Sequence, residues 1–328
     1  MKHLFILNPV SFPLSAAQNR VIKEIEDCFS SMDGQECSIH LSQYPRDAIG
    51  FIRKWVSTFK SDETIRVYAV GGDGILFDCL NGIVGLPNVE LAAVPYGTSN
   101  DFVRSFGEGK NALFRDIRLQ TDSPTILTDI IHCGNNYGLN FCAFGIESEA
   151  NMNYVHMYNH ISRYVRKFRK LNSFVYTTLL LVSGAMAVFN KKVLFQNYSV
   201  IIDGEDLSGV YGVINIANGP CYGGNLNAVV TAMPNDGILD TIFFQCPSSF
   251  KAAYFVRPYT KGGYRRFPGN FFLKQMKKIE LRSADPLVVN LDGEVFFDTS
   301  LVVEIIPQAV RIVAPGGIAY KRKTNAQR

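Results

Sequence analysis

The chain has 328 residues, 47% of them hydrophobic, which is enough for two hydrophobic cores and favours about two domains. Its net charge of +4 is too small to require a nucleic acid partner, and we expect none. The seven cysteines are odd in number and never spaced as CxxC, which argues against a disulfide framework or a zinc site and favours a reducing cytoplasm.

The first hundred residues alternate short apolar runs with amphipathic stretches. The predicted strands are 4–7, 37–41, 65–70 and 91–94. Residues 4–7 are too short an apolar run for a signal peptide. The predicted helices begin at Ser15, Asp47, Ile75 and Phe102. This alternation predicts a parallel sheet with right-handed crossovers, in which ligands bind beyond the carboxyl ends of the strands. Loops rich in turn-forming or polar residues follow three strand ends, at 8–11, 71–74 and 97–101, and we expect them to face one crevice.

The loop Gly71-Gly72-Asp73-Gly74 joins a buried strand to a helix. Its glycines allow a close approach to a ligand, and the following helix directs free N–H groups at the loop, which suits a phosphate. Asp73 would repel a bare phosphate unless Mg²⁺ or a hydrogen-bonded hydroxyl lay between them. The loop therefore predicts metal-dependent phosphate handling, with an ordinary tight turn as the alternative.

After Pro124 the pattern changes to period two, which predicts a mostly antiparallel β half. Two hairpins are expected, one pairing 126–133 with 137–144 and one pairing 193–202 with 210–216. Further strands are expected at 238–244, 278–282, 287–290, 301–306 and 310–313.

Within this half, residues 151–190 form a helical insertion with a basic cluster followed by the apolar run Phe174–Phe189. The cluster consists of Arg163, Arg166, Lys167, Arg169 and Lys170. The apolar run is shorter than the roughly 20 residues that span a bilayer. Such a pair could rest on an anionic membrane surface or admit a lipid tail, and the alternative is a buried helix behind a solvated basic one.

Four groups of residues together resemble the diacylglycerol kinase catalytic family, the soluble bacterial lipid kinases related to sphingosine and ceramide kinases. They are Gly71–Gly74, Pro95–Phe102, Ala217–Gly224 with Pro234–Asp240, and Leu291–Glu294. Their order and spacing cover nearly the whole chain. The resemblance implies a fold of the class α/β plus β, with two domains. These are an N-terminal doubly wound α/β nucleotide domain over 1–124 and a C-terminal β-sandwich over 125–306. A C-terminal segment, about 307–328, would return to the first domain.

The resemblance also implies roles for single residues. Asp292 matches the general base, Glu294 its metal-linked partner, and Asp73 would hold Mg²⁺. Asp101 and Asp129 match carboxylates of an extended active-site network, and Asp236 matches a structural metal site. The residues implied to bind the ATP cofactor are Asn8, Ser11, Gly71, Gly72, Gly74, Gly97, Thr98, Asn100 and Asp101. On local sequence alone, Asn100 or Asp101 could instead only cap a helix.

The tripeptide Asp-Gly-Glu occurs twice. The copy at 203–205 lies between alternating runs and reads as a solvent-facing hairpin turn, so we select the copy at 292–294. The chain departs from the family pattern at Phe12, Ile75, Phe77, Asp78 and Ser99. Ile75 removes a hydroxyl, and Phe12 replaces a glycine in a loop expected to approach phosphate. These changes would alter nucleotide affinity or mark a protein that binds more than it catalyses.

The expected function is an ATP- and Mg²⁺-dependent lipid kinase that transfers the γ-phosphate to a hydroxyl of diacylglycerol or a similar lipid. We expect it in the cytoplasm, in peripheral contact with an anionic membrane. The alternatives are a kinase of a sphingoid base or of NAD, and a catalytically weakened lipid-binding protein. The oligomeric state stays open, a homodimer included.

Overall fold

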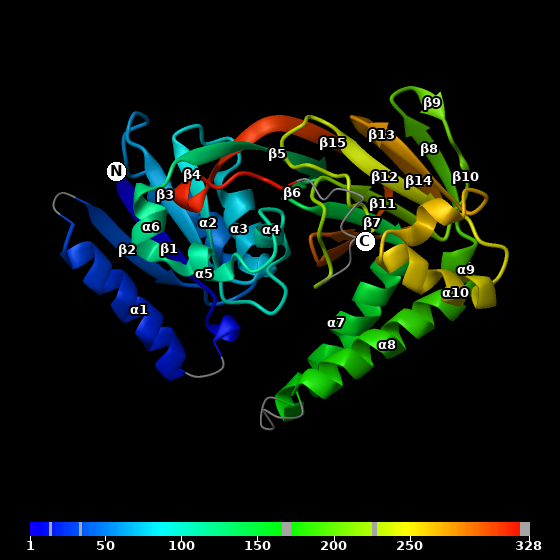
Figure 1. Ribbon diagram of the computed structural model, residues 1–328, viewed down its shortest axis with the longest axis horizontal. Helices are drawn as coiled ribbons and strands as arrows, with labels where there is room; N and C mark the ends of the chain where they lie inside the picture. Colours follow the sequence, from blue (N-terminus) through cyan, green and yellow to red (C-terminus); the bar gives the residue numbers. More distant parts are fainter. Residues whose placement is uncertain (13–14, 33–34, 166–171, 225–227, 322–328) are drawn as a thin grey trace.

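In the computed structural model, two domains share one continuous set of hydrogen-bonded strands (Figure 1). The structure describes residues 1–328 except 13–14, 33–34, 166–171, 225–227 and 322–328, and it describes 162–165, 172–174 and 176 by their backbone alone. The predicted basic cluster therefore lies outside the described side chains.

The first domain is built on parallel strands in the order β2-β1-β3-β4. Their bounds are β1 (Lys2–Leu7), β2 (Glu36–Leu41), β3 (Ile65–Gly71) and β4 (Val89–Pro95). Successive side chains of β1 point to opposite faces of the sheet, so alternate residues belong to the hydrophobic cores on the two faces. Phe5 and Leu7 pack with α1 (Ser15–Ser30), whereas Leu4 and Ile6 pack with α2 (Asp47–Val56) and α3 (Asp73–Ile83). Helices thus cover both faces, which confirms the doubly wound α/β prediction.

Short helices follow β1 and β4. They are the 3-10 helix η1 (Pro9–Ser11) and the helices α4 (Asp101–Arg104), α5 (Asn111–Arg115) and α6 (Ile117–Asp122). The loops that begin η1, α3 and α4 all lie at the carboxyl ends of parallel strands, so the sheet itself brings them to one edge.

The second domain is mostly antiparallel and encloses a core between its strands, as predicted for a β-sandwich. Its strands are β5 (Thr125–Cys133), β6 (Asn136–Gly138), β7 (Phe141–Gly145), β8 (Asn197–Ile202), β9 (Glu205–Asp206), β10 (Gly209–Val210), β11 (Val213–Ala217), β12 (Leu239–Phe244), β13 (Phe271–Met276), β14 (Lys278–Leu291) and β15 (Glu294–Val313). A second apolar layer covers the outer face of β7, β11 and β12 with residues of α8 (Asn172–Phe189) and α10 (Ser249–Thr260).

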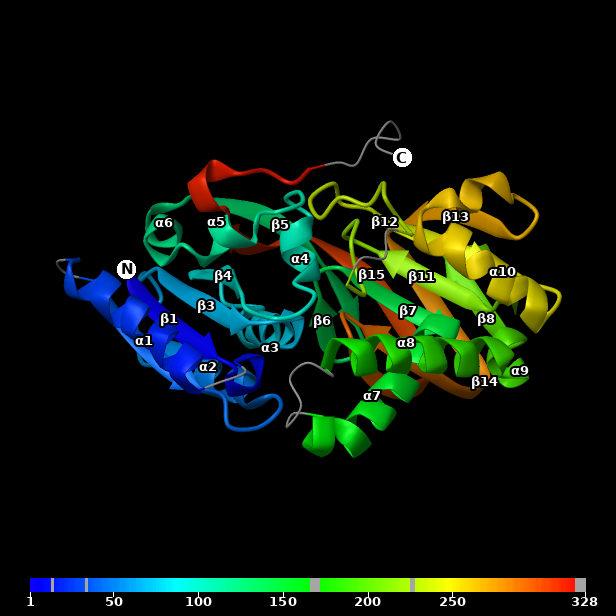
Figure 2. The ribbon, with the colours of Figure 1, turned by 60° about the horizontal axis from the view of Figure 1, so that its bottom comes forward.

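The inserted helices are α7 (Ile146–Val165), α8 and the short α9 (Lys191–Leu194). Helices α7 and α8 pack against each other and project from the second domain (Figure 1, Figure 2). Within the described residues, no helix is both long enough and apolar enough to cross a membrane.

The second predicted hairpin is wrong in part. Residues 193–194 belong to α9. Of the predicted second strand, only Val210, in the short β10, pairs with β8, which also pairs with β9 and β14. Strand β11 instead lies between β7 and β12. Every residue of β11 is buried, so this strand occupies a central position with a partner on each side. The first predicted hairpin forms between β5 and β6, but its second strand breaks before β7. Strand β13 and helix α10 were not predicted.

Strand β15 joins the two domains. It pairs antiparallel with β14 and β5, and its residues Arg311 and Ile312 run parallel to β4. A register shift between Ile306 and Val310 separates the two halves of its pairing with β5, and Gln308 adopts a left-handed conformation there with φ 51°. We propose 1–124 and 125–306 as the domain limits, with the residues after 306 extending the first domain's sheet.

Candidate functional site

The three predicted loops meet in the first domain. A Cβ placed on Gly71 would lie 2.8 Å from Ser11 Oγ and 3.4 Å from Asn8 Cβ, and one placed on Gly72 would lie 3.1 Å from Gly97 Cα. The Gly71 carbonyl accepts a hydrogen bond from Gly97 N at 3.0 Å. Glycine is therefore required at these positions by the close approach of the loops to one another.

Helix α3 begins inside this loop cluster. Its N-cap residue is Gly72, which offers no side-chain acceptor for the amides of the first turn. The side of Gly74 is open, because a Cβ there would meet only Glu294 Oε1 at 3.6 Å. Thr98 lies exposed on the neighbouring loop. This end of α3 therefore presents main-chain donors at a point where both domains are close.

Asp73 and Asp101 bind main-chain amides rather than one another. Asp73 Oδ1 accepts from Asp101 N at 2.8 Å, so this carboxylate caps α4. Asn100 occupies the N-cap position but makes no capping bond; its side chain instead binds Gly97 N at 3.0 Å and Gly97 O at 2.8 Å. The Asp101 carboxylate accepts from Gly224 N of the second domain at 3.0 and 3.1 Å. Asp101 thus ties a loop of the second domain to the first.

Asp292 lies in the tight turn between β14 and β15, with φ 50°. Its Oδ1 accepts from Asn140 N and Phe141 N, both at 2.9 Å, and its Oδ2 accepts from Leu139 N. Gly138 makes room for this carboxylate, because a Cβ there would lie 3.2 Å from Asp292 Oδ2. Three main-chain donors from the β6–β7 connection therefore hold the side chain in one orientation.

The first copy of the tripeptide has a similar local structure in a different place. Asp203 also adopts a left-handed conformation, with φ 47°, and its carboxylate accepts from Lys277 N and Lys278 N. It is exposed on the β8–β9 hairpin.

The pKa values show that three carboxyl groups share one electrostatic environment. Burial, and next the negative charge of Asp101, raise the pKa of Asp73 from 3.8 to about 7, and Asp292 adds to the rise. Burial also raises the pKa of Asp292 from 3.8 to about 6, although its three main-chain donors oppose the rise and Asp101 adds to it. Burial raises the pKa of Asp101 as well. The site therefore gathers acids that resist ionising together.

Comparison with known proteins finds family matches for both halves of the chain. Residues 2–130 match the family described as diacylglycerol kinase catalytic domain, and residues 159–314 match the YegS C-terminal NAD kinase beta sandwich-like domain. The first domain, over residues 2–130, belongs to the diacylglycerol kinase catalytic family. The second match agrees with the β-sandwich of the second domain.

Relatives of this family align along most of the chain. "Putative lipid kinase SaurJH9_0749" of Staphylococcus aureus strain JH9 is 26% identical over 304 residues, covering 90% of this chain and 92% of the relative. A protein named "Putative lipid kinase" from S. aureus strain Newman has the same identity and coverage. A crystal structure described as a putative diacylglycerol kinase from Bacillus anthracis strain Sterne superposes with a TM-score of 0.70 at 20% identity, covering 96% of this chain and 98% of that one.

Asp129 and Asp236 lie close together at the link between the domains. The resemblance to diacylglycerol kinases implies that Asp129 belongs to the active-site network and that Asp236 binds a structural metal. Asp129 is 1% exposed, and its two oxygens accept from Gln308 N and Gly237 N, each at 2.7 Å. Asp129 thus braces the irregular point of β15. Asp236 is exposed in the adjoining turn, where its Oδ1 accepts from Ile238 N at 3.2 Å. The metal site at Asp236 stays a prediction.

A residue near the site that the sequence reasoning missed is Arg46, in the β2–α2 loop. Its guanidinium lies 3.3 Å from Asp78 Oδ1 and 3.4 Å from Glu294 Oε2, and 4.3 Å from the ring centre of Phe77. Phe77 itself is buried in the core of the second domain. Arg46 and Glu294 are 248 residues apart in the chain, so their meeting leaves no local signal in the sequence.

The residues present fit the ligands that the diacylglycerol kinase family implies. The first-turn amides of α3 lack a side-chain cap, which suits a phosphate. Asp73 and Glu294 offer the hard oxygen donors that Mg²⁺ takes together with phosphate oxygens and water. Among the described side chains, no group of three or more His, Cys, Asp or Glu is arranged as a complete metal cage.

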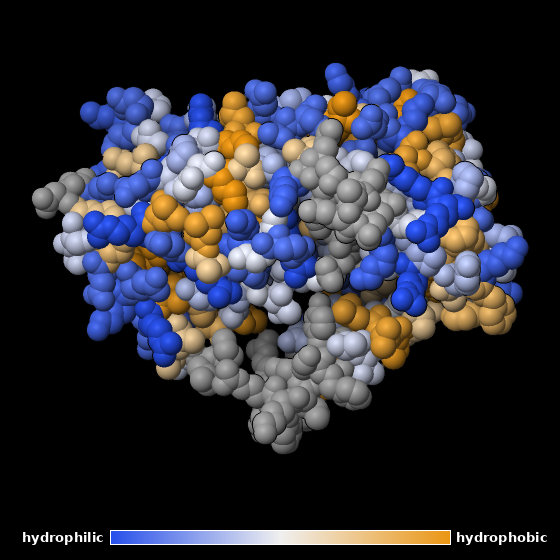
Figure 3. Space-filling model, viewed as in Figure 1, coloured by the Kyte–Doolittle hydropathy of each residue, from blue (hydrophilic) through white to orange (hydrophobic). Residues whose placement is uncertain are grey.

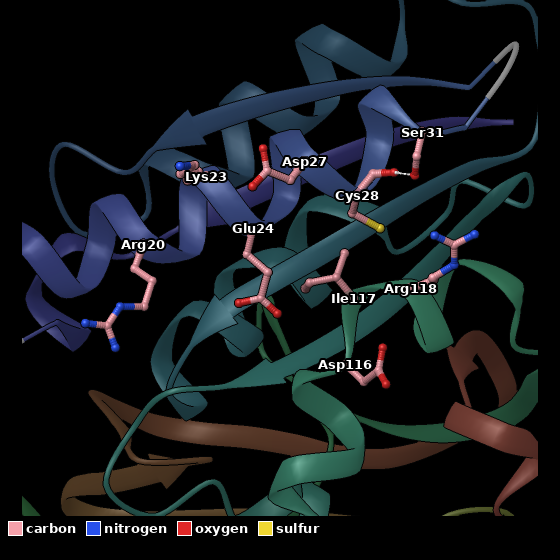
Figure 4. A pocket seen from close by; sticks show the side chains of 9 residues that line it. All are labelled: Arg20, Lys23, Glu24, Asp27, Cys28, Ser31, Asp116, Ile117 and Arg118. Carbon is pink, nitrogen blue, oxygen red and sulfur yellow. Dashed lines mark hydrogen bonds between the residues drawn. The ribbon is translucent and has the colours of Figure 1, made fainter.

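A separate groove of about 520 Å³ lies between α1 and α6 (Figure 4). Charged side chains of both helices line it, Arg20, Glu24 and Arg118 among them. None of the site residues described above lines it, so the groove is separate from the candidate site.

Proposed function

We propose that the protein transfers the γ-phosphate of ATP to a hydroxyl of a diacylglycerol-like lipid, with Mg²⁺ as the metal. The coarser statement, that the chain belongs to a family of lipid kinases, rests on the comparisons. The finer one rests on the carboxylate of Asp292, whose negative charge acts on Asp73 in the glycine loop.

The observation that carries this proposal is how Asp292 is bound. A carboxylate offers about four lone-pair positions. Two main-chain donors occupy Oδ1 and one occupies Oδ2, so about one position on Oδ2 stays available. With a pKa of about 6, this oxygen is ionised at neutral pH yet basic enough to take a proton. Asp292 is therefore an oriented general base.

The other residues supply position and charge balance. Bound ATP with Mg²⁺ would provide the phosphoryl group and neutralise its developing charge. The amides of the first turn of α3 would bind and orient phosphate oxygens, and Asp73 and Glu294 would hold the metal. Asp101 fixes the second-domain loop at Gly224, which keeps the base-bearing domain beside the loop. The Asp292 Oδ2 atom accepts the proton of the acceptor hydroxyl.

A lipid acceptor requires a surface that reaches a membrane, and the exposed face of α8 and α10 suits this role (Figure 3). Leu181 is 70% exposed and Phe250 is 80% exposed, and the Phe250 ring contacts Phe189 with centroids 5.8 Å apart. Exposed cations flank these apolar groups, namely Lys191, Lys192, Lys251 and Arg257. We propose that this face rests on an anionic bilayer. The predicted basic cluster, outside the described side chains, would add to the attraction.

The deciding experiment measures ADP release from ATP and Mg²⁺ with a panel of short-chain diacylglycerol, sphingosine and NAD. We expect release with diacylglycerol. ADP release only with sphingosine, or only with NAD, would show that this compound is the acceptor instead of diacylglycerol. Lipid binding without ADP release for any acceptor would support the alternative of a catalytically weakened lipid-binding protein.

The membrane contact is tested by sedimentation with vesicles of phosphatidylcholine containing increasing phosphatidylglycerol. Binding should rise with the anionic lipid and fall with salt. The Phe250→Ser/Tyr254→Ser variant should bind less, whereas the matched Val210→Ser/Val302→Ser variant, on exposed strand positions, should bind like the wild type. Equal binding of all three proteins, or binding indifferent to lipid charge, would remove this surface from the proposal.

A further inference from the structure

The backbone of Arg46 is the first unusual feature of the β2–α2 loop. Its φ is 70°, in the left-handed region that disfavours side chains other than glycine. A bulky arginine kept in this conformation has to be held by its surroundings. The holding contacts are made by α3, whose N-terminus is the proposed phosphate site.

The Asp78 carboxylate on α3 binds both the main-chain amide and the guanidinium of Arg46. Asp78 Oδ2 accepts from Arg46 N at 3.1 Å, and Asp78 Oδ1 lies 3.3 Å from the Arg46 guanidinium. The guanidinium also lies over the Phe77 ring at 4.3 Å, a cation–π distance. Phe77 and Asp78 follow Asp73 and Gly74 by one helical turn, so they share a side of α3 with the phosphate loop. They are also positions where this chain departs from the family pattern.

The third contact of the guanidinium is loose. Arg46 Nη2 lies 3.4 Å from Glu294 Oε2, and the two side chains are 37% and 40% exposed. Glu294 turns its other oxygen toward Gly74, where a Cβ would be 3.6 Å away. One carboxylate therefore separates the guanidinium from the first turn of α3. A half-exposed ion pair at this distance is weak, so a phosphate could displace it.

We propose that Arg46 binds the terminal phosphate of the phosphoryl donor. This inference rests on the proposed function. The site collects negative charge from Asp73, Asp101, Asp292 and Glu294, and a triphosphate adds more. An arginine held by Asp78 and the Phe77 ring can exchange its weak contact with Glu294 for phosphate oxygens, which its planar group matches well. Arg46 thereby supplies a contact in a site where Ile75 offers no hydroxyl.

The same guanidinium could bind the phosphate of a phosphorylated lipid instead, so the test compares both sources. Binding of ATP, ADP and AMP, each with Mg²⁺, and of short-chain phosphatidate is measured by calorimetry on the full chain. The variants are Arg46→Gly, which suits the left-handed backbone, Arg46→Lys, which keeps a charge, and the exposed Lys54→Gln of α2 as a control for net charge.

We expect Arg46→Gly to weaken ATP binding by about ten- to a hundredfold, with less effect on ADP and none on AMP. Arg46→Lys should recover part of the loss, and Lys54→Gln should bind like the wild type. Unchanged ATP affinity in Arg46→Gly would overturn the inference. A loss confined to phosphatidate would also overturn it, because Arg46 would then serve the lipid side.

A second comparison separates phosphate binding from a purely structural pair between the domains. Glu294→Gln frees Arg46 from its competing carboxylate, so binding of ATP in EDTA should strengthen, whereas in Arg46→Gly it should weaken. A structural pair would shift both variants in the same direction, and that result would overturn the inference. If the wild type bound no nucleotide at all, the proposed function would fail together with the inference that rests on it. If the wild type bound ATP and the Arg46→Gly variant bound it equally well, the inference alone would be refuted.

Discussion

Replacing Asp292 by Asn removes the proposed base while changing little of its surroundings. Asparagine tolerates the left-handed conformation of this turn. Its oxygen can keep the bonds from Asn140 N and Phe141 N, but its amide group then faces Leu139 N, donor against donor. That conflict costs about 1–3 kcal/mol.

The loss of charge acts in the opposite direction. A pKa raised from 3.8 to about 6 means that keeping the carboxylate ionised at pH 8 costs at most about 3 kcal/mol, and partial exposure reduces this figure. The two effects largely cancel. We therefore expect Asp292→Asn to change the free energy of unfolding at pH 8 by less than about 2 kcal/mol, while the rate of phosphoryl transfer falls by about 10²-fold or more.

The assay pairs urea unfolding with initial rates of ADP release at saturating ATP, both at pH 8. Asp203→Asn is the matched control, because it alters an Asp-Gly turn that also binds main-chain amides but lies outside the site. Its rate should equal that of the wild type. A rate for Asp292→Asn within tenfold of wild type, or an equal loss in both variants, would refute the assignment of the base.

The remaining predictions concern pH and the buried ion pair. The folded pKa values of Asp73 and Asp292, about 7 and about 6, exceed their unfolded values, so the folded state binds more protons between about pH 4 and pH 7. The free energy of unfolding should therefore fall as pH rises through this window, and Asp73→Asn should flatten the fall; identical urea profiles for variant and wild type would contradict this. Phosphoryl transfer should rise with pH through about 6 as Asp292 loses its proton, and a flat rate between pH 5 and pH 8 would count against that role. Arg66→Met should destabilise the fold by about 3–5 kcal/mol in urea, because it leaves the charge of Glu90, 2.7 Å away, without its partner. Adding Glu90→Gln should recover much of this loss, and a single variant as stable as the wild type would show that the pair is not needed.

The first domain could be predicted because its signals are local. Alternating strands and amphipathic helices show their periods within a few residues, as in α2, where Ala48, Ile52 and Val56 are buried at helical spacing. The order of strands in the second domain depends on pairings between distant segments. Strand β11 pairs with β7 on one side and β12 on the other, and its own sequence does not indicate which strands these are. The predicted pairing of 193–202 with 210–216 is wrong for residues 213–216 for this reason.

Prediction of the site had a similar limit. Glycine loops and carboxylates could be found because their residue types carry the chemistry. The donors that orient Asp292 are main-chain amides of 139–141. Nearly every residue has such an amide, so the residue types at 139–141 do not reveal this role. Arg46 likewise depends on a contact with Glu294 across the whole fold.

Strand β15 has a consequence for how the chain is made. During synthesis, the N-terminal residues emerge first, yet β4 gains its partner at Arg311 and Ile312 only when nearly the whole chain has left the ribosome. Until then one side of β4 is an unpaired edge, which is a template for association with other chains. Folding of the first domain is therefore completed late, and a chain that stops before residue 311 should aggregate in cells, although the three loops of the candidate site, at 8–11, 71–74 and 97–101, are already present.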